Sequence, residues 1–252
     1  MSGHSKWANI KFRKSAQDAK KGLVYSKLAR AILIAAKRGG KDPDVNFDLR
    51  NALTKAREFG LPKENIQRAI ARGVGEVEGL VMEEISYEGY GPGGAGLVVQ
   101  AVSENRNRTA SEVRHLFSKF GGSMATVGAV SWKFKRMGLI VVPDQKDGKP
   151  LSEDAVLDEA AQMGAEDVKA IQDGFEILTS VEQFGRIRNE LEKKGYPLRM
   201  GELTLIPTVQ VPMDGEDAKR LFDLVVELQD LEDVQNVITD ADLPDELFAQ
   251  AA

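Results

Sequence analysis

The first part of the chain has apolar residues at spacings of three and four, which is the period of an amphipathic helix. The clearest example covers residues 15–38, where Val24, Leu28 and Ile32 fall on one face. Gly39 and the glycine after it interrupt the pattern, and glycine is the residue that most often ends a helix. The spacing therefore predicts one long helix with an apolar face and a cationic face.

Two shorter helices are predicted next in the chain. Residues 46–60 begin with Asn46, a favourable N-cap, and residues 62–72 begin with a proline, which suits the first turn of a helix. Helices this short need tertiary partners to persist in water. Residues 1–76 are therefore predicted to form a three-helix bundle.

Beyond Gly73 the chain becomes richer in β-branched residues, so we expect strands. Alternation predicts strands over residues 84–87 and 97–102, and a further strand over residues 130–134. Between them, Thr109 and Glu112 have the spacing of a capping box and predict a helix start at Thr109. This part of the chain is therefore expected to be a sheet with a helix packed on it.

Residues 138–206 show the order strand, helix, strand, strand, helix, strand. The pair Asp173-Gly174 between two apolar runs is a hairpin signal, and the helices are expected over residues 152–163 and 181–194. This order is typical of a ferredoxin-like module. A short strand, a helix from Asp214 and a last strand follow it.

The predicted fold class is α+β, with an N-terminal three-helix bundle followed by two ferredoxin-like α/β modules, one inserted in the other. The expected division is a basic helical domain at 1–76, an α+β domain at 80–136 plus 207–240, an inserted ferredoxin-like domain at 138–206 and an acidic tail at 241–252. Residues 213–252 contain 12 Asp and Glu against Lys219 and Arg220, which favours a solvated face and tail.

Composition narrows the class of protein. A hydrophobic fraction of 42% with 29% charged residues is typical of a folded protein that is not embedded in a membrane. The longest apolar run, residues 31–36, is too short for a membrane span. The absence of cysteine excludes disulfides and thiolate metal sites and favours a reducing compartment. A cytoplasmic protein that does not bind membranes is expected.

The net charge of -5 conceals two parts of opposite sign. Residues 1–72 contain 17 Lys and Arg against 6 Asp and Glu, a balance of +11, which leaves -16 for residues 73–252. A one-sided basic segment attracts polyanions and gains free energy when their counterions are released. Nucleic acid is the favoured partner, and a merely solvated lysine-rich surface or an anionic membrane is the alternative.

The N-terminal segment mixes cations, hydrogen-bond donors and aromatic rings, a combination suited to phosphate contacts and base stacking. The expected nucleic-acid-binding residues there are His4, Lys6, Trp7, Asn9, Lys11, Arg13 and Lys14. Helical spacing extends the same surface to Lys20, Lys21, Lys27 and Arg30. Alternatively, the aromatic side chains pack against the bundle and contact no ligand.

A second phosphate site is expected at Arg106 and Arg108, which lie next to a predicted helix N-terminus. The alternative is an ordinary helix cap with solvated arginines. A glycine-rich loop precedes it, and we expect a rigid contact loop made of Tyr87, Tyr90, Gly91, Pro92, Gly93 and Gly94. A nucleotide site is disfavoured, because the loop lacks the Lys-Ser/Thr ending and leads into a strand.

Catalysis is not indicated. The chain has two histidines, His4 and His115, and neither lies in a metal or catalytic-triad pattern. Carboxylates are numerous but have no distinctive spacing. We expect no enzyme activity, no metal, no cofactor and no small-molecule substrate.

Three of these segments together resemble the YebC family over nearly the whole chain. They are residues 3–20, the loop at 87–94, and residues 105–109 running into Glu112-Val113-Arg114-His115. The chain departs mildly from the family pattern, with Phe12 where a histidine is frequent, Glu104 for an aspartate, and Ala125 and Ala129 in a stretch usually richer in Gly and Ser. Phe12 puts in doubt any contact of the family that requires an imidazole at this position.

The resemblance implies a helical bundle followed by two α/β modules, and a role in gene expression without catalysis. Some members are described as probable transcriptional regulators that bind DNA. Others resemble ribosome-associated factors that assist translation of proline-rich stretches. A DNA-binding regulator is the first hypothesis, and an RNA-binding translation factor is the second. A protein-interaction module that uses the Tyr-bearing loop is a hypothesis from another class.

Overall fold

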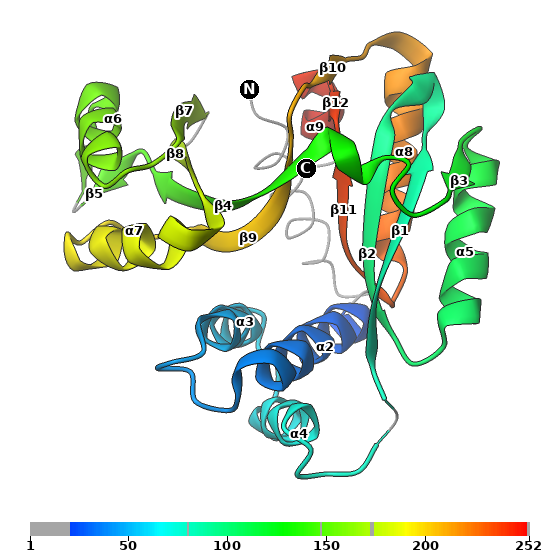
Figure 1. Cartoon of the computed structure of the whole chain (residues 1–252), viewed down its shortest axis with the longest axis horizontal. Coiled ribbons are helices and arrows are strands. Elements are labelled where there is room, and N and C mark those ends of the chain that lie inside the picture. Colours follow the sequence, from blue (N-terminus) through cyan, green and yellow to red (C-terminus); the bar gives the residue numbers. More distant parts are fainter. Residues whose placement is uncertain (1–20, 80, 147, 172–173, 251–252) are drawn as a thin grey trace. The chain divides into compact units, whose positions relative to one another are not determined.

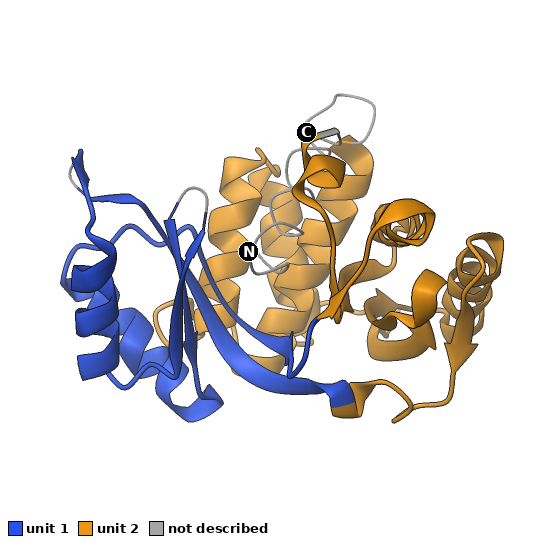
Figure 2. Ribbon diagram, turned by 90° about the horizontal axis from the view of Figure 1, so that it is seen from above, with its two compact units in different colours: residues 1–9, 133–210 blue, residues 10–132, 211–252 orange. Residues whose placement is uncertain are grey.

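The structure is a computed structural model that describes residues 21–79, 81–146, 148–171 and 174–250 (Figure 1). Its described residues divide into two compact units, a smaller one containing residues 133–210 and a larger one containing residues 21–132 together with residues from 211 onward (Figure 2). Residues 133–210 are therefore inserted between the two segments that form the larger unit. The mixed α and β content confirms the predicted α+β class.

Three helices form the bundle of the larger unit: α2 (Lys21–Gly39), α3 (Phe47–Glu58) and α4 (Lys63–Gly73). Its core includes Ile32 and Leu49, which are both fully buried. Asn46 caps α3 as predicted, since its Oδ1 accepts the N–H of Leu49 at 3.1 Å. Its amide also donates to the carbonyls of Ala35 at 2.8 Å and Gly40 at 2.7 Å, which joins α2 to α3.

The sheet of the same unit has four antiparallel strands in the order β11-β2-β1-β3. The strands are β1 (Glu83–Tyr90), β2 (Gly96–Ser103), β3 (Ser123–Ala125) and β11 (Val234–Thr239). Two helices, α5 (Arg106–Lys119) and α8 (Gly215–Asp230), pack against the sheet and against each other. Apolar side chains from both helices fill the space beneath the strands, with Phe117, Leu221 and Leu224 fully buried.

Two sequence predictions in this unit are wrong in detail. The helix α5 begins at Arg106, not at Thr109, because the Asn105 side chain accepts the N–H of Arg108 at 3.1 Å. Residues 131–133 form a 3-10 helix, η4 (Ser131–Lys133), and no strand. The buried carboxylate of Glu88 accepts the N–H groups of this segment, which removes them from a sheet ladder.

The predicted acidic tail is also wrong for the described residues. A short strand β12 (Ala241–Asp242) pairs with β10 (Val211–Pro212) in parallel, and a helix α9 (Asp245–Gln250) follows. The rings of Phe222 and Phe248 meet edge to face with centroids 5.5 Å apart. Apolar residues between the acidic ones, such as the buried Leu243, therefore hold this segment on the fold.

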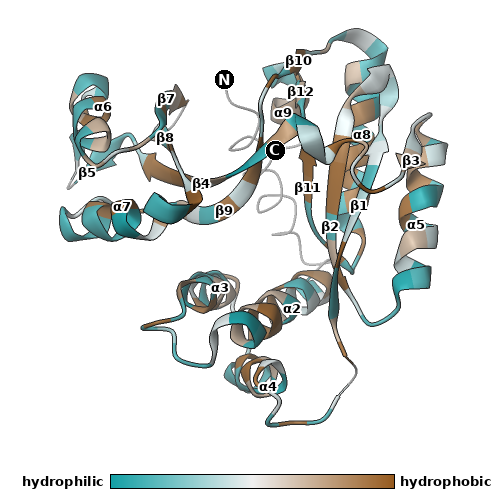
Figure 3. Ribbon diagram, in the orientation of Figure 1, coloured by the Kyte–Doolittle hydropathy of each residue, from teal (hydrophilic) through white to brown (hydrophobic). Residues whose placement is uncertain are grey.

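The smaller unit contains β4 (Phe134–Pro143), α6 (Glu153–Gln162), β7 (Asp167–Ile171), β8 (Gly174–Thr179), α7 (Val181–Lys193) and β9 (Met200–Pro207), with a short hairpin of β5 (Gln145–Lys146) and β6 (Lys149–Pro150) after β4. Its sheet order, β7-β8-β4-β9, is that of a ferredoxin-like fold. The strand order of the sheet in the larger unit, β11-β2-β1-β3, differs from this order. Figure 3 shows β4 as largely hydrophobic and α7 as largely hydrophilic, and Ile140 and Ile187 are fully buried.

Candidate nucleic-acid interface

Most of the predicted nucleic-acid-binding residues lie outside the described residues: His4, Lys6, Trp7, Asn9, Lys11, Arg13, Lys14 and Lys20. Lys21 is exposed at the start of α2. The structure does describe the other predicted residues: Lys27, Arg30, Arg106, Arg108 and the glycine-rich loop. Most of them bind groups of their own chain, which the sequence did not predict.

Lys27 and Arg30 are directed toward the loop between α8 and β11. The Lys27 ammonium donates to the main-chain carbonyls of Gln229 and, at 2.6 Å, Val234. Arg30 donates to the carbonyl of Glu232 at 2.6 Å and to its carboxylate at 2.8 Å, and its side chain is only 11% exposed. The prediction that both belong to an open phosphate-binding stripe is wrong in this structure, because they bind the sheet part of their own chain.

Asp233 is the second partner of Arg30 and the central carboxylate of this region. It is 1% exposed, lies 3.2 Å from Arg30 and pairs with Arg108 at 2.9 Å. It also accepts hydrogen bonds from the hydroxyls of Thr109 at 2.6 Å and Ser103 at 2.8 Å. Burial alone would raise the pKa of Asp233, but the hydrogen bonds from Arg108, Thr109 and Ser103 outweigh it and lower that pKa.

Arg108 is therefore occupied by an internal carboxylate, which corrects its assignment to a phosphate site. Arg106, the other arginine of that predicted site, is exposed on the first turn of α5. Its main-chain carbonyl accepts the hydroxyl of Tyr87 at 3.1 Å. The helix N-terminus thus combines an ordinary Asn105 cap with two exposed arginines, of which Arg108 pairs with Asp233 while its side chain stays 44% exposed.

The predicted contact loop is largely buried. Tyr87 is 7% exposed, Gly91 and Pro92 are buried, and the Tyr90 hydroxyl donates to the carbonyl of Ala129 at 2.9 Å. Only Gly93 and Gly94 are exposed, both with positive φ, which explains the glycines. The expectation that this loop displays its tyrosines is wrong, because both hydroxyls bind main-chain carbonyls of the same unit.

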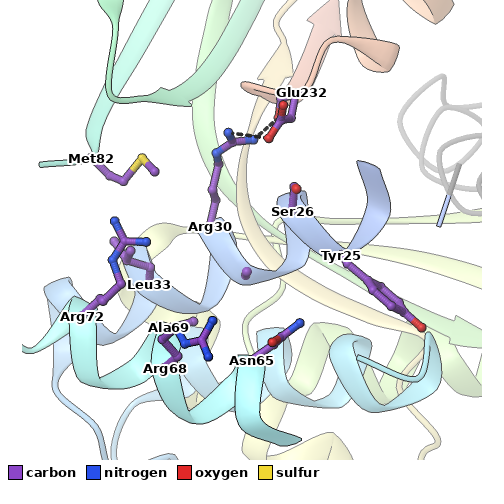
Figure 4. Close-up of a pocket in the computed structure, with 11 residues that line it drawn as sticks. Tyr25, Ser26, Arg30, Leu33, Asn65, Arg68, Ala69, Arg72, Met82 and Glu232 are labelled. Carbon is purple, nitrogen blue, oxygen red and sulfur yellow. Dashed lines mark hydrogen bonds and ion pairs between the residues drawn. The ribbon is translucent and has the colours of Figure 1, made fainter. Parts of the chain in front are cut away.

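A pocket of about 300 Å³ lies between α2, α4 and the loop before β11 (Figure 4). We call it the arginine pocket, because α2 contributes Arg30 while α4 contributes Arg68 and Arg72. Its other lining residues are Tyr25, Ser26, Ala29, Leu33, Asn65, Ala69, Met82 and Glu232. It contains the guanidinium and hydroxyl donors that a phosphate group requires.

Sequence reasoning did not identify Arg68 and Arg72. Their spacing of four, with Asn65 three residues before Arg68, places all three on neighbouring positions of one helix face. This spacing can be seen in the sequence. That the same face of α4 packs next to α2 can be seen only in the structure. Arg68 is exposed at the mouth of the arginine pocket.

The bundle keeps most of its positive charge. Residues 21–72 contain 12 Lys and Arg against 5 Asp and Glu. Three of these cations pair with carboxylates from later in the chain: Arg30 with Glu232 and Asp233, Arg38 with Glu84, and Lys41 with Glu76 at 2.6 Å. Among the remaining cations of the described bundle, Arg57, Lys63 and Arg68 are exposed to solvent.

Within the described residues, no group of three or more His, Asp or Glu side chains is arranged to hold a metal ion. No helix among them is long and apolar enough to cross a membrane. The fold and the pocket thus define an α+β protein in which a basic helical bundle is joined to a sheet by arginine–carboxylate contacts.

The chain belongs to the TACO1/YebC family. Residues 5–76 match the N-terminal domain of the TACO1/YebC protein, and residues 82–241 match the TACO1/YebC second and third domain. A relative from Dictyoglomus turgidum, named "Probable transcriptional regulatory protein", is 47% identical over 250 residues, which is 98% of each chain. A relative of the same name from Natranaerobius thermophilus is 47% identical and covers 98% of this chain and 99% of its own.

A solved structure has a similar fold. The crystal structure of a conserved hypothetical protein from Aquifex aeolicus matches with a TM-score of 0.80 at 42% sequence identity. The match covers 90% of this chain and 92% of that one. The predicted family resemblance is thus confirmed.

Proposed function

We propose that this protein is a non-enzymatic, nucleic-acid-binding regulator of gene expression that acts on DNA in transcription in the cytoplasm. The observation that carries the proposal is the charge division, +11 for residues 1–72 against -16 for the remainder. Such a division orients a polyanion toward the bundle and away from the acidic part of the chain. The names of the relatives agree with a regulatory role in transcription.

The described surface of the bundle supports this proposal. Arg57, Lys63 and Arg68 are exposed on α3 and α4, in addition to the partly buried cations that bind within the chain. We propose three functional parts: the basic bundle at 1–76, the α+β part at 80–136 plus 207–240, and the inserted part at 138–206. In this arrangement the bundle supplies the contacts with phosphates.

A ribosome-associated, RNA-binding translation factor that assists synthesis of proline-rich stretches is the second candidate. It is favoured by the aromatic residues Trp7 and Phe12 among the N-terminal cations, because unpaired bases stack on aromatic rings. Both candidates use the same phosphate contacts. In-cell crosslinking followed by sequencing of the recovered nucleic acid separates them, since promoter DNA supports the first and ribosomal RNA the second.

The direct test is the salt dependence of binding by the full chain. If the bundle contacts about six phosphates of duplex DNA, log K falls against log salt with a slope of about -5. Changing Lys6, Arg13, Lys14 and Lys20 together to Glu should abolish binding. A matched control reverses four exposed cations of the other unit, Arg136, Lys149, Lys169 and Lys193.

Both variants change the net charge by the same amount, so only the location of the charge differs. The proposal predicts loss of binding for the N-terminal variant and a much smaller loss for the control. A flat salt titration, or equal losses in the two variants, contradicts it. Binding of a protein partner that survives the N-terminal reversal would favour a protein-interaction module instead.

A further inference from the structure

A second group of cations lies on α5, in the part of the chain that is otherwise acidic. Residues 106–119 contain four Arg and Lys against one Glu, whereas residues 73–252 as a whole have a balance of -16. The helix packs on β1, β2, β3 and α8 through a buried side that includes Val113 and Phe117 (Figure 1). Its opposite side is exposed and carries polar residues.

Five exposed residues make up this side, which we call the α5 outer face: Ser111, Arg114, His115, Ser118 and Lys119. They follow one another at helical spacings of three and four, so they form one continuous surface. The face combines two formal positive charges with an imidazole and two hydroxyls. Cations together with neutral donors are the groups that proteins use to hold phosphate oxygens.

Arg114 and Lys119 differ from Arg108 of the same helix in what they bind. Arg108 pairs with the buried Asp233 at 2.9 Å. In the part of the chain that the structure describes, no carboxylate forms an ion pair with Arg114 or Lys119. Glu112, the one acid of α5, is half-buried, and its charge acts on Arg108. The two cations of the α5 outer face are therefore open to an anion from solution.

The neighbouring helix limits where such an anion can lie. α8 packs against α5 and contains five Asp and Glu against Lys219 and Arg220. This excess of negative charge repels a polyanion. A polyanion on this side of the unit is therefore expected to follow α5 and to avoid α8.

We propose that the α5 outer face is a second contact surface for the phosphate backbone of the nucleic acid, outside the basic bundle. This inference rests on the proposed function and extends it to the part of the chain that is acidic overall. Arg114 offers a phosphate two parallel hydrogen bonds from its planar fork, whereas Lys119 acts as a point charge. Ser111 and Ser118 provide hydroxyl donors between them. Such contacts position a backbone and read no sequence.

The dimensions of α5 agree with this role. The helix has 14 residues, so it is roughly 21 Å long, about the rise of six nucleotides of one strand. Its N-terminal end is connected to the bundle through Asp233, which binds Arg30 of α2 as well as Arg108. A strand that contacts both the bundle and the α5 outer face therefore has to be longer than these six nucleotides.

The first test measures fluorescence anisotropy of the full chain with a 24-nucleotide single-stranded RNA and a 24-base-pair DNA duplex over a range of salt concentrations. Changing Arg114 and Lys119 together to Gln removes two phosphate contacts. It should weaken binding about tenfold and reduce the magnitude of the salt slope by about 1.4 for the RNA and about 1.8 for the duplex. The matched control changes Lys219 and Arg220 to Gln, which removes the same two charges from the exposed side of α8 and should leave the slope at the wild-type value. Thermal unfolding verifies that both variants are folded.

The second test uses the absence of cysteine from the chain. Ser118→Cys places a single thiol in the α5 outer face, and a photoactivatable group attached to it should crosslink to a bound oligonucleotide. Asp223→Cys places the same group on the exposed side of α8 as the control. A crosslink requires nucleic acid at the labelled side chain, so long-range attraction by net charge does not produce one.

Equal salt slopes in the two double variants, together with no more crosslinking at Ser118 than at Asp223, would overturn the α5 surface while leaving binding by the bundle intact. A wild-type chain that binds neither oligonucleotide overturns the proposed function and the α5 surface together. A Ser118 crosslink that persists in the N-terminal charge-reversal variant supports the α5 surface and contradicts the bundle as the main contact. Competition by poly-glutamate with the same dependence on Arg114 and Lys119 would mean that the face attracts any polyanion, which overturns a phosphate site.

Discussion

Arg30 of α2 and Asp233, the residue before β11, form an ion pair at 3.2 Å, and the same carboxylate accepts a hydrogen bond from Arg108 of α5 at 2.9 Å. Asp233 is 1% exposed, so the pair joins the bundle to the sheet within the protein interior. The cations that the sequence suggested for phosphate contacts thus include two that hold the larger unit together. A cation that faces solvent can contact a phosphate, whereas one that faces a buried carboxylate stabilises the fold.

Asp233→Asn should lower the free energy of unfolding by about 2–3 kcal/mol. With the amide nitrogen at the position of Oδ1, which accepts Arg108 at 3.1 Å, this nitrogen faces that guanidinium, and the hydroxyls of Ser103 and Thr109 lose their charged acceptor. Denaturant unfolding measures the change. Glu232→Gln, at an exposed position beside it, should cost less than about 1 kcal/mol. Equal losses at both positions would contradict the role assigned to the buried carboxylate.

Stability should also decrease at acidic pH. The pKa values of Asp233 and Glu88 are both lowered in the fold, in each case because hydrogen bonds to the carboxylate outweigh the effect of burial. A carboxyl group whose native pKa lies below its unfolded value, about 4, stabilises the native state above that value. That contribution is lost as the pH falls through the native pKa. Unfolding measured from pH 7 to pH 2.5 should show this loss, and Asp233→Asn should show a smaller one.

Glu88 holds the segment before β4 through three main-chain hydrogen bonds. Its carboxylate accepts the N–H groups of Gly128 at 2.9 Å, Val130 at 2.6 Å and Ser131 at 2.8 Å, and it is 3% exposed. Glu88→Ala leaves these donors without their acceptor and should cost about 2–3 kcal/mol. Hydrogen exchange should accelerate at these three amides first. Unchanged protection there would show that other groups hold the segment.

Local sequence signals predicted the helices from α2 to α8 and most of the strands, although α5 begins three residues earlier than predicted and α9 was not predicted. The Asn46 cap and the ferredoxin-like order between β4 and β9 follow from short-range patterns of cap residues, apolar spacing and hairpin residues. The apparent strand at residues 130–134 has the same alternation, yet its amides bind Glu88, more than 40 residues earlier. A local pattern cannot reveal an acceptor that far away in the sequence.

The site was less predictable than the fold for the same reason. Net charge identified the basic bundle, but the sequence does not show which cations face carboxylates from distant segments. Arg30 and Arg108 meet Asp233 only after β11 joins the sheet beside β2. Arg68 carries no local signal beyond its helical spacing, and it becomes part of a pocket only when α4 packs on α2.

Two glycines of the ferredoxin-like unit give opposite predictions for the same substitution. At Gly138 in β4 an added Cβ would lie 2.3 Å from the Thr179 hydroxyl oxygen and 2.4 Å from the ring of Phe184, which is 4% exposed. Gly138→Ala should therefore destabilise this unit by about 1–3 kcal/mol, since a buried ring cannot move away freely. At Gly185 in α7 no heavy atom other than those of its chain neighbours and its own helix backbone lies within 4 Å of the new Cβ, so Gly185→Ala should stabilise the helix by about 0.5–1 kcal/mol. Hydrogen exchange of the β4 amides in the full chain reports on this unit. Faster exchange for Gly138→Ala and slower exchange for Gly185→Ala is the expected result. Slower exchange in both variants would show that backbone entropy, not the Phe184 contact, determines the effect at Gly138.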